Sequence, residues 1–368
     1  MRDGFEVDPA ELLRDLVATP SVTGREDDVR DLVVEVLDEH GVPHEVDEMG
    51  NVLAGERGGV LLNAHMDTVP AGDGWTVTDP YEPRVVGGRL YGRGAADCKG
   101  GLAAAVSAVV EANYEGLPLC LLATVGEESP REDDNGTLHA CRRGLDALGG
   151  IVCEPTDEEV HVGDRGRITL EVVIRGESAH ASTPEKGRNP IEAAARVVEE
   201  LSRLAPSRCR VRGVGRVESS LSVTRIEAGG PSNVIPDECR LTVDYRAIPG
   251  DSVEEVRDRV ERAARRAAPG FDVEVKVRSA SRATAVDPDS RVVRWVVEAA
   301  REEGLEGELG FKLGHCDIEY LVHEAGLDSV IFGPRGGNIH GPDEWVDVES
   351  VRRCARVYLR VSERAAQT

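Results

Sequence analysis

Lysine is almost absent from this chain of 368 residues, and acidic residues far outnumber basic ones. Only four of the 44 basic residues are lysines, namely Lys99, Lys186, Lys276 and Lys312. The chain has 68 acidic residues, so its formal net charge is −24. Such a field repels nucleic acid and anionic lipid, so neither is expected as a partner. An acidic, lysine-poor surface also suits a salt-rich cytoplasm, where counterions screen the repulsion, and we expect a salt-adapted host.

The chain also lacks membrane, secretion and disulfide signals. No apolar stretch reaches the 18 residues or more that a membrane span requires. The opening MRDGFEVDPA has neither the basic nor the apolar region of a secretory signal. Eight cysteines occur without a CxxC pair, and a chain of this size folds without disulfides. We therefore expect a cytoplasmic protein with reduced thiols.

Two kinds of secondary-structure pattern divide the chain. Outside residues 166–280, short apolar strands alternate with helices, which is typical of a largely parallel sheet covered on both faces. Within 166–280 the predicted order is strand, helix, two strands (218–227 and 238–247), helix and strand, the ferredoxin-like arrangement. We predict an α/β fold whose main domain is discontinuous, residues 1–165 and 281–368, and is interrupted by a smaller α+β domain.

Histidine and carboxylate side chains follow the predicted strands. His65 and Asp67 come directly after an apolar run that ends at Ala64. The further candidates, each after an apolar run or in a glycine-rich loop, are Asp97, Glu127, Glu128, Glu154 and His340. In open α/β sheets, sites form beyond the carboxyl ends of the strands, so these side chains can converge. Imidazole and carboxylate are ligands of Zn²⁺, Co²⁺ and Mn²⁺, and their co-occurrence predicts a metal site.

Each candidate has a simpler interpretation when it is taken alone. A single histidine after a strand is usually a loop residue, and Asp97 could cap the helix expected from residue 101. The acidic run that begins at Glu127 could be a solvated loop. Gly92 and Gly94 could begin a nucleotide-binding GxGxxG loop, but Asp97 stands where its third glycine belongs. That departure argues against a nucleotide-binding oxidoreductase.

Five motifs, in their order and spacing, resemble a known family. They are HMDTVP, GRGAADCKGG, GEE, CEPT and HGPDE. With them the chain resembles the M20 metallopeptidases, a group that includes acetylornithine deacetylase, succinyl-diaminopimelate desuccinylase, aminoacylase-1 and glutamate carboxypeptidase. The resemblance covers nearly the whole chain. It implies that the main domain is catalytic and that the inserted domain is a lid through which a homodimer forms.

The resemblance also implies a dinuclear metal centre and its ligands. Zn²⁺ is the first expectation for both ions, with Co²⁺ or Mn²⁺ as alternatives. The implied ligands are His65 and Glu154 on the first ion, Glu128 and His340 on the second, and Asp97 bridging both. Members of the family hold a cis peptide after the bridging aspartate, so the bond between Asp97 and Cys98 is expected to be cis.

Three further residues receive catalytic roles from the resemblance. Glu127 is implied to act as the general base that deprotonates the attacking water and returns the proton to the leaving amine. Asp67 is implied to hold the second ring nitrogen of His65. His180 is implied to reach across the dimer interface to the partner's active site and to stabilise the oxyanion.

The substrate-binding residues implied by the resemblance leave the substrate open. Asn233 and Arg246 match lid positions that hold the substrate carboxylate. Related deacylases carry Gly-Thr-Ser-Asp in a second catalytic segment, where this chain has Gly314, His315 and Cys316 before the aspartate. An imidazole and a thiol therefore replace two hydroxyl groups near the substrate.

The expected activity is hydrolysis of the amide bond of an N-acyl amino acid. Deacetylation of acetylornithine or acetyllysine and desuccinylation of succinyl-diaminopimelate lead the candidates. A metallo-carboxypeptidase or dipeptidase of the same family, acting on a short peptide, is the alternative. In the resembled family, glutamate at position 154 accompanies acylases and carboxypeptidases, whereas aspartate there accompanies aminopeptidases and some dipeptidases. A non-catalytic ligand-binding relative is more remote, because the general base Glu127 is intact.

Overall fold

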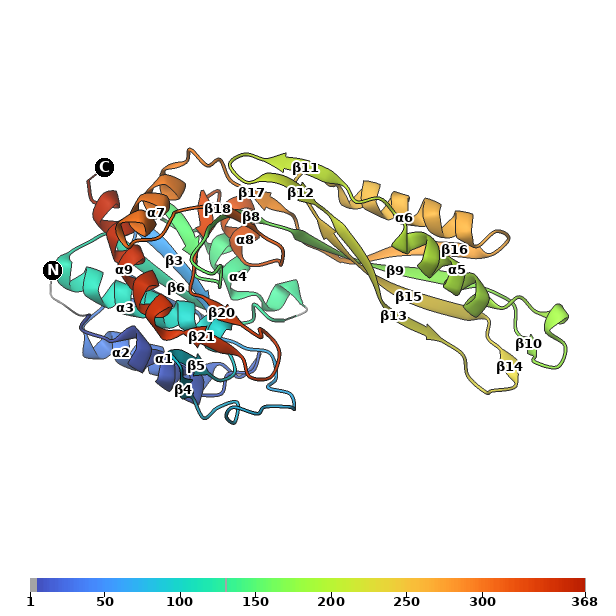
Figure 1. The fold of residues 1–368 in the computed structure, drawn as a ribbon, viewed down its shortest axis with the longest axis horizontal. Coiled ribbons are helices and arrows are strands. Elements are labelled where there is room, and N and C mark those ends of the chain that lie inside the picture. The colour runs from blue at the N-terminus through green and yellow to red at the C-terminus, as the bar shows by residue number, and fades with distance from the viewer. Residues whose placement is uncertain (1–4, 130, 368) are drawn as a thin grey trace. The chain divides into compact units, whose positions relative to one another are not determined.

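The chain divides into two compact units. A computed structural model describes residues 5–129 and 131–367. The first unit, called the sheet unit, comprises Met1–Gly163, Val286–Lys312 and Cys316–Thr368. The second, called the insert unit, comprises Asp164–Ala285 and Leu313–His315. Figure 1 labels the elements of both units.

The sheet unit is built on a mixed sheet whose centre is parallel. Its strands run in the order β1 (His44–Val46), β2 (Val52–Gly55), β6 (Leu119–Thr124), β3 (Val60–His65), β7 (Gly149–Val152), β19 (Ser329–Ile331) and β8 (Val160–Asp164). The short strand β18 (Leu309–Lys312) also pairs with β8. β3 pairs in parallel with β6 and β7, and β7 pairs in parallel with β19. These four strands are buried along their whole length, as expected where helices cover both faces.

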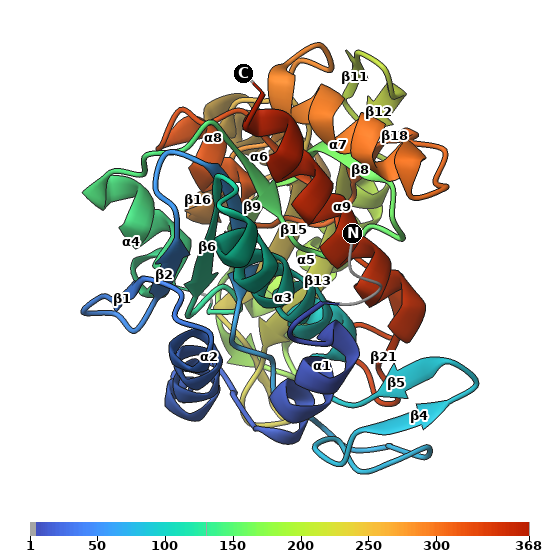
Figure 2. The same cartoon turned by 90° about the vertical axis from the view of Figure 1, so that its left-hand side faces the viewer.

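Helices cover the two faces of this sheet. On one face lie α1 (Pro9–Ala18), α2 (Asp27–Glu39), α3 (Gly100–Glu115), α7 (Arg291–Glu302) and α9 (Val348–Ala365). On the other lie α4 (Gly136–Arg143) and α8 (Ile318–His323), which share an apolar core with Leu61 and Leu122 of the strands. Figure 2 shows α3 and α4 on either side of β6. Among the described residues, no helix combines the length and the apolar character that crossing a bilayer requires.

Helix α3 is buried almost throughout its first three turns, because its residues are small. Its start fits closely against the carboxyl end of β7. A Cβ atom on Gly101 would lie 1.8 Å from the backbone oxygen of Cys153, so only glycine allows this approach. The chain just before α3 is thereby brought beside the chain that follows β7.

A small antiparallel sheet carries two loops of the sheet unit. Its strands run in the order β20 (Gly336–Gly337), β21 (Trp345–Asp347), β5 (Arg89–Tyr91) and β4 (Arg84–Val86). Pairing of β21 with β5 joins a segment from the end of the chain to one from its first third. The loop between β20 and β21 and the loop after β5 are therefore neighbours.

The insert unit has ferredoxin-like topology. Its sheet is antiparallel, in the order β13 (Ser220–Ala228), β15 (Glu238–Ala247), β9 (Gly166–Arg175) and β16 (Asp272–Ala280). Helices α5 (Pro190–Ser202) and α6 (Val253–Ala267) pack on one face, where alternate residues of β15 are buried. The chain order β9, α5, β13, β15, α6, β16 confirms the predicted fold class.

Candidate metal centre and active site

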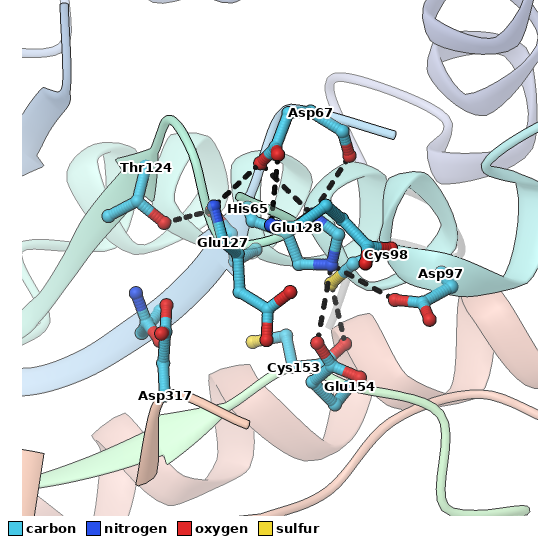
Figure 3. A network of polar contacts seen from close by, with 12 residues as sticks. His65, Asp67, Asp97, Cys98, Thr124, Glu127, Glu128, Cys153, Glu154 and Asp317 are labelled. Atoms are coloured by element: carbon cyan, nitrogen blue, oxygen red, sulfur yellow. Dashed lines mark hydrogen bonds and ion pairs between the residues drawn. The ribbon is translucent and has the colours of Figure 1, made fainter. Parts of the chain in front are cut away.

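His65, the last residue of β3, presents its imidazole at the carboxyl edge of the sheet (Figure 3). Its Nε2 lies 2.9 Å from Oδ1 of Asp97 and 3.2 Å from Oε1 of Glu154. Its Nδ1 lies 2.9 Å from the backbone oxygen of Asp67 and 3.5 Å from Oδ1 of the same residue. Since carbonyl and carboxylate oxygens only accept, Nδ1 donates to Asp67 and Nε2 donates to the carboxylates; a cation bound at Nε2 would take the place of that second proton.

A second imidazole approaches Asp97 from its other oxygen. Nε2 of His340 lies 2.7 Å from Oε1 of Glu128 and 3.4 Å from Oδ2 of Asp97. These two hydrogen bonds raise the pKa of His340 to about 10. His340 lies in the loop between β20 and β21 with a φ of 63°, which is unusual for a residue other than glycine. Asp97 thus directs one carboxylate oxygen to each imidazole, His65 and His340.

The turn that holds Asp97 also places a thiol at the site. The Asp97–Cys98 peptide is cis, which confirms that prediction. The potential ligand atoms of His65, Cys98 and Glu154 all lie within 4.8 Å of one another. Sequence reasoning did not assign Cys98, although its place next to the predicted bridging aspartate was a signal. Its thiol donates to the backbone oxygen of Cys153 at 3.4 Å, and burial raises its pKa well above the usual range.

Asp67 holds the turn that carries the two adjacent glutamates. Its Oδ1 accepts the backbone N–H of Glu127 and its Oδ2 that of Glu128, both at 3.1 Å. Oδ2 also accepts the hydroxyl of Thr23 at 2.8 Å. Burial acts to raise the pKa of Asp67, but hydrogen bonds from His65 and Thr23 outweigh it and lower the pKa. Asp67 therefore holds the turn through its buried carboxylate and the imidazole chiefly through its backbone oxygen.

The Glu127 carboxyl group points into the space between Glu154 and Asp317 (Figure 3). Burial raises its pKa well above the usual range, and the charges of Glu154 and Asp317 act in the same direction. Asp317 is itself held by the side chains of Asn135 and Thr137. A carboxyl group with a raised pKa suits the transfer of protons to and from a reacting group.

Lys312 is a charged neighbour that the sequence analysis did not identify. Its Nζ lies 3.1 Å from Oε2 of Glu154, and the two side chains are 16% and 5% exposed. Burial acts to lower the pKa of Lys312, but the charge of Glu154 outweighs it and raises the pKa. Glu154 thus divides its oxygens between Lys312 and His65. The only signal in the sequence was the rarity of lysine.

Strands β10 (Ala179–His180) and β14 (Val234–Ile235) lie at one end of the insert unit (Figure 1), and they carry the exposed His180 and, just before β14, the exposed Asn233. His180 ends β10, which pairs with β14 directly after Asn233. Nδ1 of His180 accepts the backbone N–H of Ser182 at 3.1 Å. Nε2 is therefore the ring nitrogen of His180 that is left to contact another group.

The other residues predicted to bind substrate also belong to the insert unit. Arg246 lies near the end of β15, opposite Arg167 at the start of β9, and its Nε donates to Asp244 at 2.7 Å. His180 follows the far end of β9, so the structure does not bring it together with Arg246. Gly314 and His315 belong to a short segment, Leu313–His315, that joins the insert unit from the later part of the chain. Nδ1 of His315 lies 3.3 Å from Oδ2 of Asp164.

Comparison with known proteins gives a family and named relatives. Residues 61–364 match the model of peptidase family M20/M25/M40. A succinyl-diaminopimelate desuccinylase from Cereibacter sphaeroides is 33% identical, over 96% of this chain and 98% of that protein. An acetylornithine deacetylase from Myxococcus xanthus is 31% identical, over 83% of this chain and 79% of that protein.

Solved structures share the fold. An M20 metallo-carboxypeptidase from Sulfolobus solfataricus superposes with a TM-score of 0.80 at 18% identity, over 98% of this chain and all of that one. A dinuclear metal-binding M20 peptidase from Bacillus subtilis superposes with a TM-score of 0.74 at 18% identity, over 98% of both chains. Identities this low establish the architecture alone. The family match spans most of the chain, and this protein is a member of peptidase family M20/M25/M40.

Proposed function

We propose that the protein is a dinuclear-metal-dependent hydrolase that cleaves the amide bond of an N-acyl amino acid. The desuccinylase and deacetylase relatives support this substrate class over nearly the whole chain. One observation carries the proposal: one carboxylate oxygen of Asp97 lies next to His65, and the other lies next to His340. A carboxylate in that position can bridge two ions in a way that a single-ion site does not need.

The side chains present fit two divalent ions. Each proposed set has one imidazole and one carboxylate of its own besides the shared Asp97, an N and O donor set that Zn²⁺, Co²⁺ and Mn²⁺ all accept. We propose His65 and Glu154 for the first ion and Glu128 and His340 for the second. Burial raises the pKa of Glu128, so a cation nearby would favour its charged form. We propose Zn²⁺ for both ions, to be checked by metal analysis of the purified protein.

The chemistry divides between the ions and Glu127. When bound, the ions would polarise the amide carbonyl and lower the pKa of the attacking water. Glu127 accepts a proton from that water and returns it to the departing amine. Asp67 keeps Glu127 and His65 in place through the contacts described above. The raised pKa of Glu127 favours the return of the proton.

A substrate screen tests the proposal. The purified protein, loaded with Co²⁺, is given acetylornithine, acetyllysine, succinyl-diaminopimelate, other acylated amino acids and dipeptides. We expect one N-acyl amino acid to be cleaved with the highest kcat/KM. A preference for dipeptides or peptide C-termini would instead identify a dipeptidase or a carboxypeptidase. Absence of any metal-dependent hydrolysis would identify a non-catalytic relative.

We propose that the two units are a catalytic domain and a lid, and that the lid forms a homodimer. The separation of His180 from Arg246 supports this assignment. The length of β9 lies between them, roughly 25 Å at the usual rise per residue, which is longer than an N-acyl amino acid. One lid therefore cannot bring both side chains to one substrate. A partner subunit can supply His180 and Asn233, while Arg246 comes from the other subunit.

Subunit mixing tests the dimer. Each of the variants Glu127→Ala and His180→Ala alone should be nearly inactive. A mixture that forms heterodimers should regain activity, because one of its two sites then combines an intact Glu127 with an intact His180. No recovery in heterodimers isolated by affinity tags would contradict shared sites.

We further propose a cytoplasmic protein adapted to high salt. All eight cysteines are free thiols, and Cys209 alone among them is partly exposed, which fits a reducing compartment. The formal net charge of −24 should destabilise the fold at low salt through self-repulsion. We expect the unfolding midpoint to rise with KCl up to molar concentrations. A midpoint independent of KCl would contradict the salt adaptation.

A further inference from the structure

A buried ion pair lies beside the proposed metal centre and has no part in the chemistry described so far. Nη1 of Arg93 lies 2.5 Å from Oε2 of Glu344, and each side chain is 1% exposed. Arg93 precedes Asp97 by four residues, and Glu344 follows His340 by four. A buried pair is expensive to desolvate unless further hydrogen bonds satisfy its remaining donors and acceptors. The partners of each side chain therefore show what the pair does.

The carboxylate of Glu344 holds the loop that contains Asp97. Its Oε2 accepts the backbone N–H of Gly94 at 3.0 Å. Its Oε1 accepts the backbone N–H of Ala96 at 3.0 Å and that of Asp97 at 3.1 Å. Three backbone donors within four residues of one loop thus converge on a single side chain from the other end of the sequence. The position of the Asp97 backbone depends directly on that side chain.

The guanidinium of Arg93 holds the loop that contains His340. Its Nη2 donates to the backbone oxygen of His340 at 3.2 Å and to that of Gly341 at 3.1 Å. The same nitrogen donates to the backbone oxygen of Ala71 at 3.1 Å, in the segment that follows β3. Planar guanidinium groups suit such a role because their donors are fixed in direction. Through these hydrogen bonds Arg93 links the segment that follows His65 to the loop that contains His340.

We infer that Arg93 and Glu344 form a reciprocal clasp that sets the position of Asp97 relative to His340. Each residue stands in one of the two ligand loops, and its side chain binds the backbone of the other loop. The ion pair between the two side chains connects these two sets of hydrogen bonds. Both are positioning residues, because the hydrogen bonds of their side chains go to each other and to backbone groups. The inference rests on the proposed function in that it takes Asp97 and His340 as metal ligands.

Cobalt binding tests the clasp without measuring hydrolysis. The full chain is stripped of metal with a chelator and titrated with Co²⁺ alone, followed by calorimetry and by the visible absorption of the bound ion. We expect wild type to bind two ions. The variant Glu344→Gln keeps its size but turns an amide N–H₂ toward backbone donors. We expect it and Arg93→Lys to bind at least one ion about 10- to 100-fold more weakly, with an altered spectrum.

A matched control separates positioning from general loss of a buried charge. Glu303 is 9% exposed and paired with Arg356 and Arg360, away from both loops. Glu303→Gln should lower the unfolding midpoint while leaving both Co²⁺ affinities and the spectrum unchanged. If the single clasp variants fail to fold, the double variant Arg93→Met with Glu344→Met removes both charges together and is titrated in their place.

The outcomes distinguish the clasp from the proposed function. Any folded clasp variant with wild-type Co²⁺ affinities and spectrum would overturn the clasp. Weakened binding in the clasp variants but not in Glu303→Gln would support it. A wild type that binds two Co²⁺ ions but hydrolyses no amide would overturn only the proposed function. A wild type that binds no Co²⁺ would overturn both the clasp and the proposed metal centre.

Discussion

The carboxylate of Asp67 accepts the backbone N–H of Glu127 at 3.1 Å, which joins the chain after β3 to the chain after β6. The same carboxylate accepts the next backbone N–H, that of Glu128, at the same distance. Residues next to each other in a strand point to opposite sides, so a turn is needed to aim two successive glutamates at one centre. The buried anion of Asp67 stabilises that turn.

Replacing Asp67 by Asn should therefore disturb more than His65. The amide oxygen can accept one of the two N–H groups, but the amide nitrogen is a donor and opposes the other. Leaving a buried donor unsatisfied costs about 1–3 kcal/mol, so the free energy of unfolding should fall by that amount. We expect kcat to fall at least ~100-fold, because Glu127 loses its position. Denaturant unfolding and steady-state kinetics check the two effects.

The neighbouring Thr23 provides the comparison. Thr23→Val removes one hydroxyl donor to Asp67 and leaves the carboxylate in place. It should lower kcat much less than Asp67→Asn does. Equal effects of the two substitutions would mean that the hydroxyl, rather than the anion, holds the turn.

Glu127 and Glu128 should separate turnover from metal binding. Glu127→Gln keeps the shape but removes the proton-accepting group, so metal content should stay at the wild-type level while kcat falls by about 10²- to 10⁴-fold. Glu128→Gln should instead reduce the metal content, because it weakens a proposed ligand. Elemental analysis and kinetics of the two variants check this. A Glu127→Gln enzyme with near wild-type kcat would refute the general-base assignment.

Arg246 should make hydrolysis depend on a free α-carboxylate. Arginine can grip a carboxylate with two parallel hydrogen bonds, which an amide cannot accept equally. Amidating the substrate should cost at least ~10-fold in kcat/KM, and Arg246→Ala should reproduce much of that loss. In the Arg246→Ala enzyme the acid and the amide should be cleaved at similar rates. Equal turnover of the matched acid and amide by wild type would exclude this role.

Buried thiols should weaken the fold at alkaline pH. Burial raises the pKa of Cys120 and of Cys141 to about 12, whereas an unfolded thiol titrates at about 8.5. Between these values the unfolded state binds fewer protons than the folded state, so stability falls as pH rises, by about 1.4 kcal/mol per pH unit for each thiol. Below about pH 8.5 neither thiol contributes a pH dependence.

Unfolding free energies of the double variant Cys120→Ala with Cys141→Ala, measured from pH 8 to 11, check this prediction. Its alkaline slope should be shallower than that of wild type. Replacing the partly exposed Cys209 by alanine is the comparison, and it should change the slope less. An unchanged slope in the double variant would show that these thiols do not titrate between the two limits.

The predictable parts of the fold were those whose pattern is local. The apolar run before His65 and the small-residue run of α3 each allow one burial pattern, so their ends could be predicted within a few residues. The strand predicted over 218–227 is present as β13 (Ser220–Ala228). The hairpin of β11 (Arg208–Val211) and β12 (Gly215–Glu218), which comes just before it, was not predicted. Gly213, with a φ of 83°, permits the turn between β11 and β12, which the polar residues around it did not indicate.

The parts of the site that escaped prediction depend on pairing across long sequence separations. Arg93 and Glu344 each stand in a motif quoted from the sequence, but nothing local shows that their side chains meet. Lys312 beside Glu154 is a similar case, because a lysine on a short strand is usually exposed. Single candidate ligands could be predicted because strand ends concentrate them. Their supporting contacts could not, because these are set by packing between distant segments.

The place of β19 in the sheet has a consequence for how the chain acquires its fold. This strand comes late in the sequence, yet it lies between β7 and β8. During synthesis, one edge of β7 therefore stays unpaired until residues 329–331 have left the ribosome and can form β19. Pairing across so long a separation is slow, and an unpaired strand edge invites association with other chains. Chains truncated before β19 should therefore aggregate rather than persist as partly active fragments.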